Sequence, residues 1–595
     1  MSCRRGDNHI FGLREPTEIM ASALGACRRH FYAAAGFSAL LNLLFIAPML
    51  YMLQVYDRVV PAQGHMTLFF LTIVVTFSLI TLSLLEFFRS RLLVRASIRL
   101  DRQLSAIILD TTLSRRGSTI DTMRKQALRE FDTLRQALTG PAILAIFDAP
   151  WTPIYILICF LIHPAIGALV LVGGVLLAVL TLRNEQVTSG PLKQANEAAG
   201  RAYATQEQVL AGAEVVRALG MREAMVQRHL GEREAMMSLQ TSASLAASKY
   251  VSASKFLRLA IQSLALGLGA WLAIDNKITA GAIFASAFLA GRALQPIDQV
   301  LGSWRSVVQA RDAYKTLNDL LAARESDIST TLLPDPVGHI SVEQLVVLNA
   351  DGDGAILAGI SFKVEPGEVV AVIGPSGAGK STLLRMLAGA GKADRGAIRF
   401  DGADSSDWDS ERLATFIGYL PQDTSLFDGT IKNNIARFES QVRGKQAAVD
   451  EAAVAAARDA GAHDMILRQS SGYDAMLGWG GRGLSAGQAQ RVGLARALYR
   501  NPPIVLLDEP NAHLDAEGEA QLVDTINALK ARKASVIIVA HRTGVLSAVD
   551  KILLLNAGRV DAYGSRDDIL LQLRNGTPPA NTSKKPGAVK SEIKA

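Results

Sequence analysis

Cysteine is scarce in this chain of 595 residues, which contains only Cys3, Cys27 and Cys159. The three do not have the spacing of a metal-ligand set, and Cys159 lies inside an apolar run. This scarcity excludes a disulfide framework and a zinc site as the basis of the fold. We interpret all three as ordinary unpaired thiols.

The chain also lacks a strong excess of one charge, because 62 basic residues stand against 55 acidic ones and the formal net charge is +7. Many of the basic residues flank long apolar runs, where membrane orientation accounts for them. The charge therefore gives no support to a nucleic-acid partner. A removable signal is missing as well: the first long apolar run has no cleavage site after it, so we expect it to be retained.

What the chain has is apolar sequence, with 49% hydrophobic residues and a mean hydropathy of +0.21. These values are high for a wholly soluble protein. Apolar runs, each near the ~20 residues that cross a bilayer, lie at 31–54, 66–88, 142–162, 164–182, 256–274 and 278–300. We predict a transmembrane helix in each of the six.

An even number of spans places both termini on one side of the membrane, and arginines indicate which side. They cluster before the first span and after the second, at Arg4, Arg5, Arg14, Arg28, Arg29, Arg89, Arg91, Arg95, Arg99 and Arg102. The loop between these two spans holds only Arg58. By the positive-inside rule, both termini should be cytoplasmic.

Two long connections, Arg89 to Pro141 and Arg183 to Lys255, alternate apolar and charged residues at helical spacing. We interpret them as helices that extend beyond the bilayer and turn near Arg115 to Ser118 and near Ala211 to Gly220. The alternative is a separate soluble helical bundle.

Ionisable groups inside spans are costly, so Asp148 and Arg292 are expected to line a passage or to pair with each other. A position at the lipid interface is the alternative. Pro150 and Pro153 are expected to kink the helix that carries Asp148.

A glycine-rich loop follows the apolar run Val369 to Ile373 and reads GPSGAGKST. A buried strand that enters such a loop before a helix turns backbone N–H groups toward phosphate oxygens. Lys380 would neutralise terminal phosphate charge, and Ser381 could ligate magnesium. The pattern predicts binding of ATP with Mg²⁺.

Two further motifs follow in a fixed order, LSAGQ (Leu484 to Gln488) and IVLLDEP (Ile504 to Pro510), and IIVAHR places His541 after another apolar strand. Each motif alone is weak evidence: Glu509 would be an ordinary surface carboxylate and His541 a structural histidine. Their shared order after the glycine-rich loop predicts hydrolysis of ATP.

The region from Ile340 to Arg574 resembles the nucleotide-binding domain of ABC transporters, and the six spans resemble one exporter half. The resemblance implies that Glu509 polarises the attacking water, that His541 contacts the γ-phosphate and that Asp515 links two active sites. Loss of Glu509 should abolish turnover while leaving binding largely intact. It also implies a nucleotide site made of Gly374, Pro375, Ser376, Gly377, Ala378, Gly379, Lys380, Ser381, Thr382, Gln422, Ser485, Gly487, Gln488 and Asp508.

In this family, Ser381, Gln422 and Asp508 would hold the metal and its hydration shell. Ser485 and Gly487 would face the γ-phosphate bound to the opposite subunit, and one copy of each motif therefore implies a homodimer with two composite sites. The expected fold class is an α-helical membrane domain of six transmembrane helices with long cytoplasmic extensions, fused to an α/β P-loop domain. The expected divisions are a cytoplasmic segment (1–25), the membrane domain (26–310), a linker (311–338), the nucleotide domain (339–575) and a disordered tail (576–595).

The chain departs from the family pattern in three places. No aromatic residue occurs between Ile340 and Gly359, where many members stack one on adenine, so base selectivity is expected to be weak. Ala486 replaces a usual glycine of the signature, and a small effect is expected because Gly487 is retained. His513 stands where the family has a smaller or uncharged residue, and we interpret it as a solvated loop histidine.

The membrane segments Phe45 to Pro61, Phe147 to Pro164 and Leu294 to Arg305 resemble the peptidase-free type I secretion ATPases of Gram-negative bacteria. This resemblance implies an inner-membrane exporter of unfolded polypeptides that works with a membrane-fusion (periplasmic adaptor) protein and an outer-membrane channel protein. Residues 1–25 leave no room for a papain-like processing domain, so substrates should not be cleaved by this chain.

Two other functions remain open. An exporter of lipid or small molecules would have the same architecture and would need no periplasmic partner. An ATP-gated channel with little turnover is disfavoured by the presence of Glu509 and His541.

Overall fold

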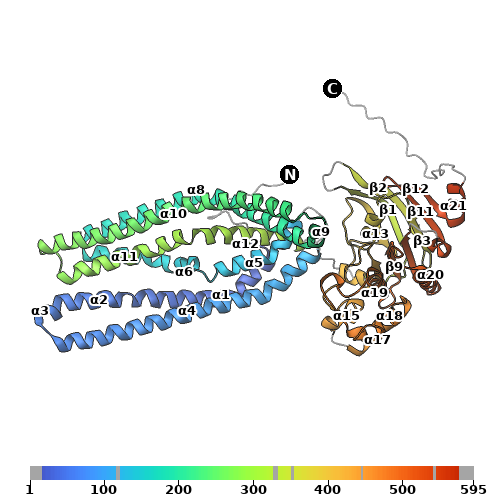
Figure 1. The fold of residues 1–595 in the computed structure, drawn as a ribbon. Coiled ribbons are helices and arrows are strands. Elements are labelled where there is room, and N and C mark those ends of the chain that lie inside the picture. The colour runs from blue at the N-terminus through green and yellow to red at the C-terminus, as the bar shows by residue number, and fades with distance from the viewer. Residues whose placement is uncertain are drawn as a thin grey trace, which may run out of the picture. The chain divides into compact units, whose positions relative to one another are not determined.

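The computed structural model describes residues 16–114, 121–325, 333–349, 354–443, 446–540 and 544–574. They form two compact units, a helical unit from α1 to α12 and a unit of strands and helices from β1 to α21 (Figure 1). The predicted turn at Arg115 to Ser118 and the catalytic candidate His541 lie outside the described residues.

The helical unit contains, in chain order, α1 (Glu18–Leu44), α2 (Ile46–Gln54), the π-helix η1 (Val55–Val59), α3 (Val60–Ala62), α4 (His65–Ser114), α5 (Asp121–Ala137), α6 (Pro141–Asp148), the 3-10 turn η3 (Ala149–Trp151), α7 (Thr152–Ile162), α8 (Pro164–Ala211), α9 (Ala213–Ala218), α10 (Arg222–Ile274), α11 (Ala280–Gly302) and α12 (Trp304–Glu325). Within the described residues, six helical stretches are long and apolar enough to cross a membrane. Five of the six predicted spans lie wholly inside one of them, and the sixth, 278–300, overlaps α11 but begins before its first residue, Ala280.

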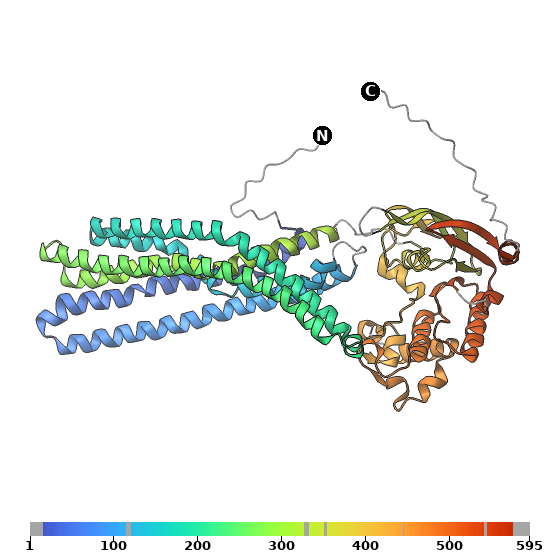
Figure 2. The same cartoon turned by 45° about the horizontal axis from the view of Figure 1, so that its top comes forward.

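Three of these helices are far longer than a membrane requires: α4 has 50 residues, α8 has 48 and α10 has 53. At 1.5 Å per residue, α4 is about 75 Å long, whereas the hydrocarbon core is about 30 Å thick. Helices α8 and α10 run side by side for much of their length (Figure 2). Helices α4, α8 and α10 each continue a membrane helix without a break, which confirms these extensions and contradicts a separate soluble bundle. Helix α5 differs, because it ends at Ala137 before α6 begins at Pro141.

The helix that carries Asp148 is broken, as its prolines predict. Helix α6 ends at Asp148, the 3-10 turn η3 contains Pro150, and Pro153 lies in the first turn of α7. A proline lacks the N–H that an unbroken helix would use, so regular α-helical hydrogen bonding is interrupted by a 3-10 turn at this point.

A buried polar cluster surrounds Asp148, and it corrects the pairing expected from the sequence. Arg89 of α4 is only 6% exposed, and its Nη1 lies 3.1 Å from Asp148 Oδ1 and donates to Ser38 Oγ of α1 at 2.9 Å. Asn42 Nδ2 also donates to Asp148, at 2.9 Å. The predicted pair of Asp148 with Arg292 is therefore wrong.

Arg292 has other neighbours. Its guanidinium lies over the Phe45 ring, 3.2 Å from the centroid, and donates a hydrogen bond to Gln295 on the same helix. That either charge lines a passage stays a prediction.

The second unit is built on two main sheets. An antiparallel sheet has the order β2-β1-β4-β5, and a six-stranded sheet has the order β12-β11-β3-β10-β9-β6. Neighbouring strands from β11 to β6 are parallel, and β12 is antiparallel at the edge. The strands are β1 (Ile340–Leu348), β2 (Ala355–Val364), β3 (Val369–Ile373), β4 (Arg395–Phe400), β5 (Ala403–Asp404), β6 (Ile417–Leu420), β9 (Ile504–Asp508), β10 (Ser535–Val539), β11 (Lys551–Asn556) and β12 (Arg559–Ser565), and a small pair is formed by β7 (Gly429–Thr430) and β8 (Met476–Leu477).

Helices cover this sheet and extend beside it. They are α13 (Lys380–Leu387), α14 (Ser410–Thr415), α15 (Ile431–Ile435), α16 (Glu439–Arg443), α17 (Gln446–Asp459), α18 (His463–Leu467), α19 (Ala486–Leu498), α20 (Ala516–Ala531) and α21 (Arg566–Arg574), with the 3-10 turns η4 (Gly472–Asp474), η5 (Trp479–Gly481) and η6 (Val545–Ala548). The central strands are apolar throughout because both of their faces are buried. Val370 of β3 packs in one core with Leu383 of α13, while its neighbour Val369 packs in the other with Val492 of α19.

Candidate nucleotide site

The glycine-rich loop lies between β3 and α13, at the edge of the sheet where the parallel strands end. Gly374 has φ +153°, and a Cβ there would lie 2.0 Å from the carbonyl oxygen of Leu555 in β11. Gly379 has φ +95°, and a Cβ there would lie 2.6 Å from Leu357. Both positions therefore require glycine, and the tight loop leaves the N-terminal N–H groups of α13 available for an anion.

Lys380 begins α13 and folds back over the loop. Its Nζ donates to the carbonyl oxygens of Gly374 and Pro375, each at 2.9 Å. Burial lowers the pKa of the Lys380 amine, and the nearby carboxylates of Glu509 and Asp508 oppose this effect. The ammonium thus stays beside the loop, where it can neutralise phosphate oxygens.

Asp508 is the last residue of β9 and is 2% exposed. Its Oδ1 accepts a hydrogen bond from Ser381 Oγ at 3.2 Å, although the two residues are far apart in the sequence. Burial raises the pKa of the Asp508 carboxyl, the hydrogen bond from Ser381 opposes this and Glu509 adds to it. A carboxylate beside a hydroxyl gives the oxygen ligands that a hydrated magnesium ion accepts.

Glu509 directly follows the strand and has an unusual backbone. Its φ is +50°, in the left-handed region that non-glycine residues rarely adopt. Its N–H donates to the carbonyl oxygen of Val539 in β10 at 3.2 Å. Backbone strain of this kind persists only where neighbouring contacts enforce it, and it is common at functional sites.

Gln422 lies beyond the end of β6, which pairs with β9 so that Leu420 is opposite Leu507. Gln422 and Asp508 therefore belong to the same edge of the sheet, and the side chain of Gln422 is exposed. Strand β10 ends at Val539, opposite Asp508, so the chain leaves the sheet at the same edge just before the undescribed His541.

The signature residues form the start of α19. Ser485 is the N-cap: its Oγ accepts from Gln488 N–H at 3.3 Å, and its own N–H donates to Gln488 Oε1 at 2.9 Å. This capping box fixes the first turn of the helix. Within the described part of the chain, no hydrogen bond joins Ser485 or Gly487 to the glycine-rich loop, so the fold of one copy does not bring these two predicted parts of the site together.

Residues 509 to 515 connect β9 to α20 and lie against α19. Asp515 is the N-cap of α20 and accepts from Gly518 N–H at 2.9 Å, and Arg491 of α19 pairs with it at 3.3 Å. The side chains of Ala486 and His513 are exposed. This agrees with a solvated histidine, while the small effect of Ala486 stays a prediction.

Gln490 is a residue that the sequence analysis missed. It is 4% exposed, and it bonds to the backbone at both ends of the segment from Glu509 to His513. The available signal was its position three residues after Gly487, which places both on one face of α19.

Gly487 touches the same segment, and this gives a testable prediction. A Cβ at this position would lie 2.8 Å from the carbonyl oxygen of His513, so the backbone of one segment must shift. We expect Gly487→Ala to lower ATP hydrolysis by about tenfold, because overpacking costs about 1–3 kcal/mol. Phosphate release by purified protein measures this. The matched control Ala486→Gly should stay within about twofold, since the exposed Ala486 methyl can be removed without opening a cavity; equal losses in both variants would contradict the prediction.

Comparisons with known proteins agree with this geometry. The family described as ABC transporter matches residues 357–512, and the family described as ABC transporter transmembrane region matches residues 31–295. A solved bacterial Atm1-family ABC exporter with ATP bound has the same fold, with a TM-score of 0.78 at 24% identity over 94% of this chain and 99% of that one. The chain is thus an ABC transporter with a fused membrane region, and it is an ATPase.

Its relatives define the family more narrowly. The type I secretion system ATP-binding protein PrsD of Rhizobium meliloti is 40% identical over 93% of this chain and 94% of its own length. The cyclolysin secretion/processing ATP-binding protein CyaB of Bordetella pertussis is 30% identical over 74% of this chain and 61% of its own length. The alpha-hemolysin translocation ATP-binding protein HlyB of Escherichia coli O157:H7 is 25% identical over 90% and 75%. The chain belongs to the ATP-binding proteins of type I secretion systems, and the predicted fold class and family are confirmed.

Proposed function

We propose that this protein exports unfolded polypeptides across a bacterial inner membrane, driven by ATP hydrolysis, as the ATPase and permease of a type I secretion system. The observation that carries the proposal is the 40% identity to PrsD along nearly the whole of both chains. The long apolar helices and the phosphate-binding loop supply the two parts that such an activity needs, a path through lipid and a source of energy. A lipid or small-molecule exporter has no comparable support.

ATP with Mg²⁺ would bind at the sheet edge described above. The residues fit this group: the N-terminus of α13 and Lys380 suit the phosphates, while Ser381, Asp508 and Gln422 offer oxygen ligands. No cluster of three or more His, Cys, Asp or Glu residues suited to a metal occurs in the described ranges, and magnesium at a phosphate site needs only one or two protein carboxylates. The metal would neutralise charge on the phosphates, while Glu509 would orient the attacking water and His541 would contact the γ-phosphate.

Two copies of the chain would form the working unit. Ser485 and Gly487 begin α19, where a hydroxyl and free N–H groups can meet the phosphates held by the opposite subunit. Each site would then need residues from both subunits, and closure of the two nucleotide domains around ATP would reshape the membrane passage. Both termini and the nucleotide domains would be cytoplasmic.

Partners are needed on the other side of the membrane. The connections at that side are short, with α3 ending at Ala62 before α4 begins at His65, and α7 ending at Ile162 before α8 begins at Pro164. Such short loops cannot bridge a periplasm. We therefore assign a membrane-fusion protein and an outer-membrane channel as partners.

Deletion of the gene tests the proposed substrate class. We expect one or more proteins to disappear from the culture supernatant and to return when the gene is restored, whereas the Glu509→Gln gene should not restore them. Comparative mass spectrometry of supernatants measures this. Export of lipid or small molecules would be favoured instead if the set of extracellular proteins is unchanged and lipid or small molecules stimulate the ATPase.

A further inference from the structure

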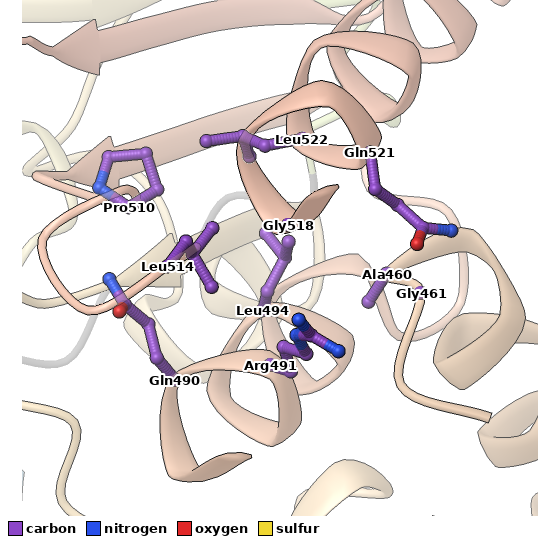
Figure 3. A pocket seen from close by; sticks show the side chains of 10 residues that line it. All are labelled: Ala460, Gly461, Gln490, Arg491, Leu494, Pro510, Leu514, Gly518, Gln521 and Leu522. Atoms are coloured by element: carbon purple, nitrogen blue, oxygen red, sulfur yellow. The ribbon is translucent and has the colours of Figure 1, made fainter. Parts of the chain in front are cut away.

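The side chain of Gln490 joins α19, the helix that begins after the signature serine, to the segment from Glu509 to His513 of the same subunit. Its Nε2 donates to the carbonyl oxygen of Glu509 at 3.0 Å, and its Oε1 accepts from the N–H of His513 at 3.1 Å. Figure 3 shows Gln490 on α19 beside Pro510 and Leu514 of the segment that it holds. Because the amide uses its donor at one end and its acceptor at the other, only one orientation satisfies both.

The bond to Glu509 matters because of the backbone at that residue. Glu509 is in the left-handed region, which is costly for a non-glycine residue. Its N–H is held by β10 through Val539, and its carbonyl is held by α19 through Gln490. The direction of the Glu509 side chain therefore depends on where α19 lies.

Helix α19 contacts the segment from Glu509 to Asp515 at two further points. The Cα of Gly487 approaches the carbonyl oxygen of His513 so closely that a Cβ would lie 2.8 Å from it, and Arg491 pairs with Asp515 at 3.3 Å. The contact of Gly487 lies at the start of the helix and the ion pair of Arg491 at the end of the loop, and both residues are half-buried. Gln490 is the fully buried contact, at 4% exposed. A shift of α19 must therefore move the peptide that follows Glu509.

We propose that Gln490 is a positioning residue that couples the two active sites of the dimer. This rests on the proposed roles of Glu509 toward its own nucleotide and of Ser485 and Gly487 toward the partner's. When the start of α19 engages the nucleotide bound by the partner, Gln490 transmits the helix position to the Glu509 backbone. Hydrolysis at one site then depends on closure at the other through this amide.

Two substitutions separate positioning from simple packing. Gln490→Leu removes both hydrogen bonds but leaves an apolar side chain that fills much of the same space. We expect kcat for ATP to fall about tenfold, as for the loss of a buried hydrogen bond, with KM within about twofold because the phosphate loop is untouched. Cooperativity in the ATP dependence of the rate should fall as well.

Gln490→Glu gives the sharper result, because its hydrogen bonding depends on pH. An ionised carboxylate still accepts from His513 N–H but opposes the Glu509 carbonyl, whereas a protonated one can donate to it as the amide does. Burial at this position, where Gln490 is 4% exposed, and the Glu509 carbonyl oxygen that its amide contacts both raise the pKa of such a group. The neighbouring Arg491 opposes them, although it pairs with Asp515. The ratio of its kcat to the wild-type kcat should therefore rise as pH is lowered from about 8 to about 6.

The matched control is Gln521→Glu. Gln521 lines the same pocket from α20 but is exposed and makes no contact with Glu509 that the structure records (Figure 3). The ratio of the kcat of Gln521→Glu to the wild-type kcat should be near one at every pH.

The measurements are made on the purified full-length protein in detergent or lipid. Wild-type kcat for Gln490→Leu, or a ratio for Gln490→Glu that stays flat with pH, would overturn the proposal, as would equal losses of nucleotide binding and turnover. Hydrolysis that persists in Glu509→Gln would instead reject the proposed catalytic residue, so the two failures are distinguishable.

Discussion

Replacement of Glu509 by glutamine is expected to reduce ATP hydrolysis by at least about 10²–10³-fold, the usual effect of removing a group that acts on the transition state. The amide has nearly the same size and can still occupy the backbone position at φ +50°. It cannot accept a proton from, or polarise, the attacking water. Binding of ATP should change little, because the proposed phosphate contacts come from Lys380 and the loop from Gly374 to Gly379.

Phosphate release and nucleotide binding by the purified protein measure the two effects separately. The matched control is Glu517→Gln, which changes an exposed carboxylate in the first turn of α20 and should retain the wild-type rate. With ATP bound and not hydrolysed, the two nucleotide domains should remain closed, and cross-linking between copies should increase. Turnover above about half of the wild-type rate would show that another group activates the water.

The site could largely be predicted from the sequence because its parts lie at the ends of buried parallel strands. Apolar runs identified β3 and β9, and the ends of parallel strands meet at one edge of a sheet. The approach of Ser381 to Asp508 follows from this rule together with the glycine-rich loop, which places the start of α13 at the same edge. The long helices were predictable for a similar reason, since helical periodicity with few prolines continues from each apolar run into the charged sequence that follows it. Pro191 does not end α8, which continues to Ala211.

Gln490 was not predictable in the same way. Its two hydrogen bonds depend on the rotation of α19 about its axis and on the backbone path from Glu509 to His513. Neither is encoded by a local pattern, because a glutamine on a helix is most often an exposed polar residue. Only the packing of α19 against the segment from Glu509 to His513 determines the partners of the Gln490 amide.

The prediction that Asp148 pairs with Arg292 was wrong for a related reason. The positive-inside rule counted Arg89 among the cytoplasmic charges that flank the second span. In the structure, Arg89 is 6% exposed and pairs with Asp148. Counting charges gives the side of the membrane on which they lie but not the helix that they face. The partner of Asp148 is set by the packing of α1, α4 and α6, which no single segment reveals.

Removal of one partner of this pair is expected to be the most damaging change to the membrane domain. The side chains of Arg89 and Asp148 are 7% and 14% exposed, so loss of one leaves the other buried. Without Asp148, Arg89 keeps only the longer pair with Glu86, at 3.8 Å. Breaking a buried pair in this way costs about 3–5 kcal/mol. We expect Asp148→Leu and Arg89→Met each to lower the midpoint of thermal unfolding strongly and to reduce export, as measured on protein in detergent and in a secretion assay.

The double variant separates charge pairing from other effects. With both charges gone, no uncompensated ion remains, and the combined cost should be well below the sum of the two single costs. Asp275→Asn is the matched control, because Asp275 pairs with Lys277 at 3.2 Å on the surface and exposed pairs contribute under about 1 kcal/mol. Full additivity of Arg89→Met and Asp148→Leu would contradict the pairing. Recovery of stability without recovery of export would mean that the fold needs only the absence of an unpaired charge, while transport needs the polar contacts that Arg89 and Asp148 make with α1.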